Sequence, residues 1–270
     1  MPLFAAGPVR EALEPPGYVF NPSTIAEDNA YTLLKWVAEN DWDYTTKGPA
    51  RIGMAGWTTP YNLGLASAME EYCEAHPEQF QWMGAYLGEF SFQWGPQVEA
   101  LKGSDYVVPP VILWSFARDF RKAGYWEPRF LGVSPHIAFI GLIRDAQLWE
   151  EIEGMVFLLP SGWWSDDDCQ TIAQAKELLL RYHPESADQM MAEGGSYLAV
   201  DLVFQMLEII RNAAASVGPE RLDSEAVYEA AITYTQAANE IDDRATFTAT
   251  KRSSVNYLRA YQASAEMEDL

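Results

Sequence analysis

Residues 51–75 read RIGMAGWTTPYNLGLASAMEEYCEA, and this stretch predicts the fold of the first half of the chain. Arg51–Gly56 is a short apolar run of the kind that forms a buried strand, and Leu63–Ala75 places apolar residues at helical spacing. His76 and Pro77 end that helix, because proline lacks the amide hydrogen that a helix needs. The stretch therefore predicts one strand–loop–helix unit.

The same alternation continues along the chain as far as Pro160. Further strands are expected at 80–87, 105–108, 130–133 and 155–159, and further helices at 96–102, 111–123 and 137–142. Strands that alternate with helices form βαβ units, in which successive strands run parallel. The sequence therefore predicts an α/β fold with a mostly parallel sheet.

The pattern changes after Pro160. Three helices are expected at 171–182, 197–214 and 224–239, with no clear strand between them. Gly218 and Pro219 separate the last two helices. A chain of 270 residues is long enough for two domains, and this change of pattern indicates a second part of different construction.

The composition excludes several classes of function. The chain carries 39 acidic and 18 basic side chains, a formal net charge of -21, and Lys251-Arg252 is its longest basic cluster, so no nucleic-acid partner is expected. Cys73 and Cys169 are too few for a zinc site or a disulfide framework. No apolar run approaches the length of about 18 residues that spans a membrane, and Met1–Pro8 lacks the pattern of a signal peptide.

The carboxyl ends of the predicted strands are where an open α/β sheet binds ligands. The candidate ligand-binding residues expected there are Trp57, Tyr61, Ser134, His136 and Trp163. Aromatic and hydroxyl groups with little charge suit reversible binding of a small molecule through stacking and a few hydrogen bonds. No acid and base pair stands among them, so no catalytic residue, metal or cofactor is expected and an enzyme is not favoured.

Each of these residues also has a structural interpretation. A single tryptophan packs in a core more often than it contacts a ligand, although a place after a strand makes the two roles equal for Trp57 and Trp163. Tyr61 heads a helix and could simply pack there. His136 has no partner histidine or carboxylate at metal-binding spacing. The sequence alone leaves these alternatives open.

Six stretches, taken in order, resemble a known family. They are GYVF at 17–20, YNLGLA at 61–66, GSDYVV at 103–108, FRKAGY at 120–125, EGMVF at 153–157 and YLAVD at 197–201. The chain resembles the type I periplasmic solute-binding proteins of ABC transporters, in particular the group that binds branched-chain amino acids. The resemblance implies one complete Rossmann-like lobe with a parallel sheet, and a partial second lobe made mainly of helices.

The resemblance also implies lobe boundaries. Residues 1–19 and 160–243 correspond to a remnant of the N-terminal lobe, and residues 20–159 and 244–270 to the C-terminal, ligand-binding lobe, with crossovers near Phe20, Pro160 and Asp243. Family members carry further residues before Leu3 that supply most of the first lobe's sheet, so the chain is expected to be truncated at its N-terminus. We therefore expect an exposed apolar face on the helices at 171–182 and 197–214, and self-association through it.

The family's ligand contacts carry over only in part. Its aromatic residue at a helix start matches Tyr61, whereas its acidic partner for a ligand ammonium falls at Ser134, which has no charge. The contacts to a ligand carboxylate fall near Gly7, Pro8 and Val9, which offer little besides backbone amides. These departures imply a less charged ligand, such as an amide or an aromatic compound.

The function implied by the resemblance is binding of a small organic solute between two lobes by hinge closure, for delivery to an ABC permease in the membrane. The place of action would be the periplasm or the cell surface. A ligand sensor or regulatory receptor on the same fold is the alternative, and it would need a signalling or DNA-binding segment.

Overall fold

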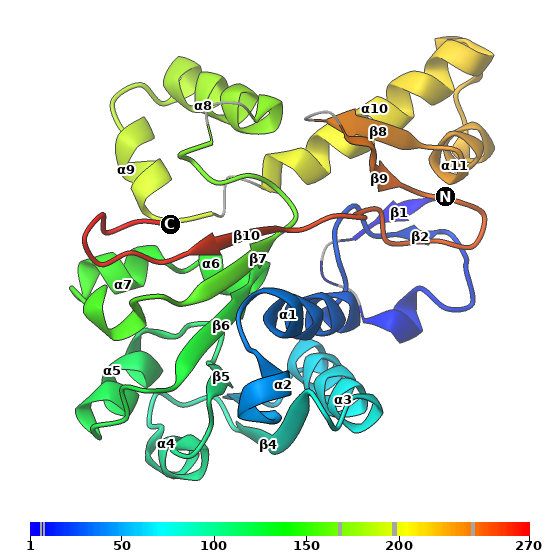
Figure 1. Ribbon diagram of the computed structural model, residues 1–270. Coiled ribbons are helices and arrows are strands. Elements are labelled where there is room, and N and C mark those ends of the chain that lie inside the picture. Colours follow the sequence, from blue (N-terminus) through cyan, green and yellow to red (C-terminus); the bar gives the residue numbers. More distant parts are fainter. Residues whose placement is uncertain (6, 8, 167–168, 196–198, 239–240) are drawn as a thin grey trace. The chain divides into compact units, whose positions relative to one another are not determined.

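The computed structural model describes residues 1–270 except 6, 8, 167–168, 196–198 and 239–240 (Figure 1). The chain divides into two compact units. Unit 1 comprises Met1–Ala26, Pro160–Asp188 and Tyr197–Arg259, and unit 2 comprises Glu27–Leu159, Gln189–Ser196 and Ala260–Leu270. The chain thus passes between the units at 26/27, 159/160, 188/189, 196/197 and 259/260, where the resemblance implies crossovers near 20, 160 and 243.

Unit 2 is built on a six-stranded sheet in the order β10-β7-β6-β5-β3-β4. Its strands are β3 (Ala50–Trp57), β4 (Phe80–Gly88), β5 (Tyr106–Val108), β6 (Arg129–Val133), β7 (Val156–Leu159) and β10 (Arg259–Gln262). The pairs β3–β4, β3–β5, β5–β6 and β6–β7 are all parallel. The α/β fold and the parallel sheet predicted from the sequence are therefore confirmed.

Helices connect these strands and surround them in Figure 1. They are α1 (Ala26–Asn40), α2 (Tyr44–Lys47), α3 (Pro60–Ala75), α4 (Gly95–Leu101), α5 (Trp114–Lys122), α6 (Ser134–Ile137) and α7 (Gly141–Asp145), followed by the short 3-10 helix η2 (Glu150–Ile152). In β3 every residue except Arg51 is buried, which is typical of a central parallel strand that is covered on both faces. This burial explains why its sequence is uninterruptedly apolar from Ile52 to Trp57.

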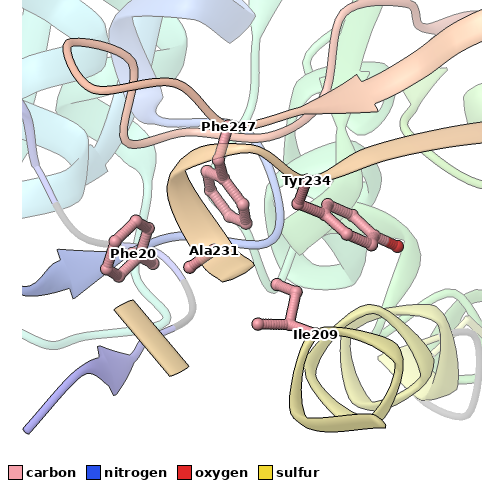
Figure 2. Close-up of a cluster of buried hydrophobic side chains, with 5 residues drawn as sticks. All are labelled: Phe20, Ile209, Ala231, Tyr234 and Phe247. Carbon is pink, nitrogen blue, oxygen red and sulfur yellow. The ribbon is translucent and has the colours of Figure 1, made fainter. Parts of the chain in front are cut away.

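Unit 1 contains helices and two small sheets. Its elements are β1 (Leu3–Phe4), η1 (Arg10–Ala12), β2 (Val19–Phe20), α8 (Gln170–Tyr182), α10 (Val200–Val217), η4 (Pro219–Arg221), α11 (Ser224–Ile232), β8 (Thr235–Ala238) and β9 (Ile241–Thr246). The helix α9 (Ala187–Ala192) is divided, with Ala187 and Asp188 in unit 1 and the rest in unit 2. The strands β1 and β2 pair in parallel, and β8 pairs antiparallel with β9. Figure 2 shows one cluster of its buried apolar side chains, formed by Phe20, Ile209, Ala231, Tyr234 and Phe247.

The predictions for unit 1 were partly wrong. The helix expected at 224–239 ends at Ile232, and β8 follows it. The run Thr233-Tyr234-Thr235 explains the change, because β-branched and aromatic residues favour a strand over a helix. The helix expected from Tyr197 begins at Val200, and Tyr197, Leu198 and Asn239 lie outside the described residues.

Apolar side chains are exposed on both helices, as expected, but on α8 they do not lie on one face. On α8, Leu178, Leu180 and Tyr182 are 37%, 54% and 65% exposed, and on α10, Val203 and Leu207 are 46% and 52% exposed. Leu178 and Tyr182 are four residues apart and share a side of α8, whereas Leu180 lies on the opposite side. On α10, Val203 and Leu207 are also four residues apart and share a side.

A buried ion pair lies at the centre of unit 1. Arg244 of β9 donates to the carboxylate of Asp201 at 2.9 Å, and both side chains are at least nine-tenths buried. The same guanidinium donates to the carbonyl oxygen of Pro160 at 2.9 Å and to the side-chain oxygen of Gln236 at 3.0 Å. Gln205 donates to Asp201 at 3.3 Å. The pair therefore joins β8, β9 and α10 to the residue at which the chain enters unit 1.

No helix among the described residues has both the length and the apolar character needed to cross a bilayer.

Candidate functional site

The carboxyl ends of the parallel strands of unit 2 lie along one edge of the sheet, because β3 to β7 all point the same way. Trp57 closes β3, and Ser134 follows β6 directly. Only β5 separates these two strands, and neighbouring strands are about 4.8 Å apart, so their ends are roughly 10 Å apart. That span matches a small organic molecule.

Tyr61 is held at this edge by the start of α3. The hydroxyl of Thr59 caps the helix by accepting from the backbone amide of Asn62 at 3.2 Å, and Asn62 donates to the carbonyl oxygen of Trp57 at 2.8 Å. Gly56 permits this approach, because a Cβ there would lie 3.0 Å from the Asn62 amide nitrogen. The turn from strand to helix therefore fixes the direction of the tyrosine.

The hydroxyl of Tyr61 meets the first turn of α1. Asn29 donates to it at 3.0 Å, and the amide oxygen of Asn29 is buried without a hydrogen bond among the described residues. Burial, with a smaller contribution from the charge of Glu27, raises the pKa of Tyr61 well above its usual value. The phenol is therefore neutral at any physiological pH and can donate a hydrogen bond to an acceptor on a ligand.

Trp57 is only 7% exposed and packs within an aromatic cluster. Its ring lies 4.8 Å from Phe90, 5.6 Å from Phe92 and 5.5 Å from Trp94, measured between centroids, and its indole nitrogen donates to the carbonyl oxygen of Ser91 at 2.8 Å. The structure thus gives Trp57 a packing role at the end of β3.

Phe90 and Phe92 were missed by the sequence reasoning. They are 70% and 38% exposed and follow β4 in the segment EFSFQW at 89–94. A sequence signal was available, because Phe90 and Phe92 stand three and five residues after the strand predicted at 80–87. The cluster makes this end of the edge apolar and aromatic.

Ser134 and His136 stand together in α6 and differ in accessibility. The hydroxyl oxygen of Ser134 is buried and has no hydrogen-bond partner among the described residues. His136 is 1% exposed and is bonded through both ring nitrogens: Nδ1 accepts from the backbone amide of Val133 at 3.1 Å, and Nε2 lies 3.0 Å from the carbonyl oxygen of Pro109.

Burial lowers the pKa of His136, so the imidazole is neutral, with its proton on Nε2 for donation to Pro109. The ring therefore joins the end of β5 to the end of β6. In this arrangement His136 positions Ser134 and offers no ring nitrogen of its own to a ligand.

Trp163 lies in unit 1, whereas the other four predicted residues lie in unit 2. It is 2% exposed, and its backbone amide donates to Asp166, which in turn accepts from Arg259 at 2.9 Å. Gly7 and Val9, expected near a ligand carboxylate, also belong to unit 1, and Pro8 lies outside the described residues. Tyr61, Trp57 and Ser134 are thus the predicted residues that one sheet edge brings together.

Solved structures of similar fold span almost the whole chain. A branched-chain amino-acid ABC transporter protein from Thermus thermophilus with bound valine superposes with a TM-score of 0.77 at 19% identity, covering 98% of this chain and 69% of that one. A leucine-binding protein from Thermotoga maritima gives 0.70 at 13% identity, covering 97% and 70%. A solute-binding protein of an R. palustris ABC transporter, in complex with 4-hydroxybenzoate, gives 0.68 at 14% identity, covering 97% and 67%.

A scan of protein-family models and a search of curated proteins found no match to this sequence. The likeness is therefore one of fold: the chain has the type I periplasmic-binding-protein fold expected from the six resembling stretches.

Proposed function

We propose that this chain is the extracytoplasmic solute-binding component of an ABC importer, and that it does no chemistry on the solute. Unit 2 is the ligand-binding lobe, and the solute is held as the two units bend toward each other at the segments that join them. A membrane permease then receives the solute. The observation that supports this most is the fold, which is shared over nearly the whole chain with binding proteins solved with valine and with 4-hydroxybenzoate.

The proposed solute is small, organic and uncharged or weakly charged. Tyr61 presents a neutral hydroxyl, Ser134 a buried hydroxyl that has no hydrogen-bond partner in the described part of the chain, and Trp57 with its cluster an aromatic flank. Trp163 contributes from unit 1, and His136 holds Ser134 in place. Two hydroxyls bind a carbonyl, amide or phenol well, but neither supplies the negative charge that an α-ammonium group requires.

A binding panel tests this proposal. Purified protein is titrated calorimetrically with valine, leucine, 4-hydroxybenzoate, benzamide and decanoate, and its thermal unfolding is followed with each compound. A neutral or aromatic member is expected to bind, and at a concentration of about 100 Kd it should stabilise the fold by roughly 2.7 kcal/mol. Tight binding of valine or leucine would contradict the proposed solute class, and enzymatic turnover of any bound compound would contradict the proposed role.

Two substitutions place the bound compound at the strand ends. Tyr61→Phe and Ser134→Ala each remove one hydroxyl and should each weaken binding about fivefold, the effect of one lost hydrogen bond. Ser67→Ala on the exposed side of α3 is the matched control and should leave affinity unchanged. Equal affinities in all three variants would show that the bound compound does not contact Tyr61 or Ser134, and would contradict a site at this edge.

A further inference from the structure

Part of the chain returns to unit 2 after it has entered unit 1. Residues 160–188 belong to unit 1, but the segment Gln189–Gly195 belongs to unit 2. We name this segment the strap. It starts inside α9 and ends just before residues that the structure does not describe. The strap is thus joined at its N-terminal end to unit 1 while its own contacts are with unit 2.

Two backbone hydrogen bonds dock the strap on the turn between α6 and α7. The amide of Gly141 donates to the carbonyl oxygen of Glu193 at 3.1 Å, and the amide of Gly195 donates to the carbonyl oxygen of Ile137 at 3.1 Å. Within the strap, Gln189 also bonds the side chain of Glu193 at 3.0 Å. Gly194 and Gly195 are buried, so these bonds are shielded from water.

Glycine is required at the points of closest approach. A Cβ on Gly141 would lie 2.4 Å from the Glu193 carbonyl oxygen and 2.8 Å from its Cα, and backbone atoms cannot give way as a flexible side chain can. Gly194 has a φ of +133°, where a side chain is strained, and a Cβ there would lie 2.8 Å from the carbonyl oxygen of Ile137. The sequence is therefore adapted to this contact on both of its sides.

The strap docks on the segment that carries the proposed site. Ile137 is the last residue of α6, which begins at Ser134, and His136 fastens the same helix to Pro109. We propose that the strap is a tether that fixes α6 at the sheet edge and limits how far the two units can move apart. The proposal rests on the proposed function only in taking Ser134 as part of the ligand site.

The substitution Gly141→Ala tests the tether. Gly141 is the first residue of α7 and has no positive φ, so alanine suits its own backbone, and the three atoms nearest to the added Cβ all belong to Glu193 of the strap. Gly103→Ala is the matched control, because a Cβ there meets only the tip of Arg51 at 3.9 Å and its φ is also not positive. Both variants change one glycine of unit 2 by one methyl group.

Two measurements on the ligand-free protein are compared. Amide hydrogen exchange should quicken roughly fivefold at Gly195 and along 134–137 in Gly141→Ala, the factor expected when one hydrogen bond is lost. Electron–electron distance measurements between spin labels at Glu74→Cys in unit 2 and Glu220→Cys in unit 1 should give a broader distribution in Gly141→Ala. Gly103→Ala should match the wild type in both, and the native thiols of Cys73 and Cys169 are buried.

Both measurements use ligand-free protein, so their results support or overturn the tether independently of the proposed solute. Faster exchange confined to the strap, with 134–137 and the distance distribution unchanged, would make the strap a surface loop and overturn the tether. If Gly141→Ala fails to fold, hydrogen exchange of the wild-type protein still tests the tether. Rapid exchange of the amides of Gly141 and Gly195 would show that the strap is not docked, and would overturn the proposal. A failure to bind any compound in the panel would count against the proposed function and leave the tether result intact.

Discussion

In unit 2, Phe116, Phe120 and Phe130 pack ring against ring at centroid distances of 5.4 to 6.0 Å and are almost fully buried. In unit 1, Phe20 and Phe247 pair at 5.3 Å in a core of five buried residues, and a buried ion pair lies in the same unit (Figure 2). Apolar side chains are exposed in both units, for example Leu207 of unit 1 and Phe90 and Trp126 of unit 2. Among the described residues, the two units thus differ in the ion pair between Arg244 and Asp201, which is at least nine-tenths buried on both sides and lies in unit 1.

We infer from this difference that the folding stability of unit 1 depends more on its buried polar network than that of unit 2 does. Apolar burial stabilises unit 2 in proportion to the area removed from water, and one substitution leaves most of it in place. Unit 1 has a smaller apolar core and relies on a polar network in which each group needs its partner. We accordingly expect substitutions at a few buried polar positions of unit 1 to lower its free energy of unfolding strongly. Substitutions of its exposed apolar residues should change that free energy little.

The largest effect is expected from Arg244→Met. The substitution removes the guanidinium and leaves the Asp201 carboxylate buried without its charge partner, which typically costs about 3–5 kcal/mol. It also frees the carbonyl oxygen of Pro160. The free energy of unfolding should fall by this amount in urea titrations followed by circular dichroism.

Arg211→Met is the matched control for that experiment. Arg211 lies on α10 in the same unit and pairs with Glu208, but its side chain is 71% exposed, so its loss should cost less than about 1 kcal/mol. Similar losses for both arginines would show that burial of the ion pair does not distinguish unit 1, and the comparison between the units would fail.

A smaller effect, in unit 2, depends on pH through His136. Burial lowers the folded-state pKa of His136 below the ordinary value of 6.5. Just below pH 6.5, the imidazole is therefore protonated in the unfolded chain but stays neutral in the folded chain. Its contribution to stability is present above pH 6.5 and is lost as pH falls below it, by about 1 kcal/mol per pH unit. Urea unfolding between pH 7.5 and 5.5 measures this slope.

His136→Gln supplies the comparison, since glutamine can still hydrogen-bond but does not titrate. The variant should be less stable at pH 7.5 and should lose less stability on acidification than the wild type does. His183→Gln, at an exposed position in unit 1, should leave the slope unchanged. A wild-type slope that survives in His136→Gln would assign the pH dependence to other groups.

The sequence predicted the secondary structure of unit 2 better than that of unit 1, because most strands of unit 2 are largely apolar runs and the strands β8 and β9 of unit 1 are not. The strand expected at 51–56 is observed at Ala50–Trp57, because a buried parallel strand requires an apolar run that the sequence shows directly. The strand β9 reads IDDRAT, and its one buried charged residue, Arg244, gives no pattern that distinguishes it from a loop. Pairing partners 43 residues apart cannot be read from local spacing.

The candidate site shows the same limit. Location after a strand was enough to predict Tyr61 and Ser134 at one sheet edge, since parallel strands end together. The bracing role of His136 depends on the carbonyl oxygen of Pro109, 27 residues away, which spacing does not reveal. The strap could not be predicted either, because a segment that leaves one unit and docks on another has no periodic signal.

The smallest effect on stability is expected at the exposed face of unit 1. Leu207 is 52% exposed on α10, so Leu207→Lys removes little buried surface and should change the free energy of unfolding by less than about 0.5 kcal/mol. The same change places a positive charge within the exposed apolar surface and should weaken self-association through it. Sedimentation velocity over a concentration series measures this, with Lys176→Leu on α8 as the opposite change, expected to strengthen association. If Leu207→Lys destabilises unit 1 as strongly as Arg244→Met does, the face is part of the core of unit 1, and the contrast between a tolerant surface and a sensitive polar network is wrong.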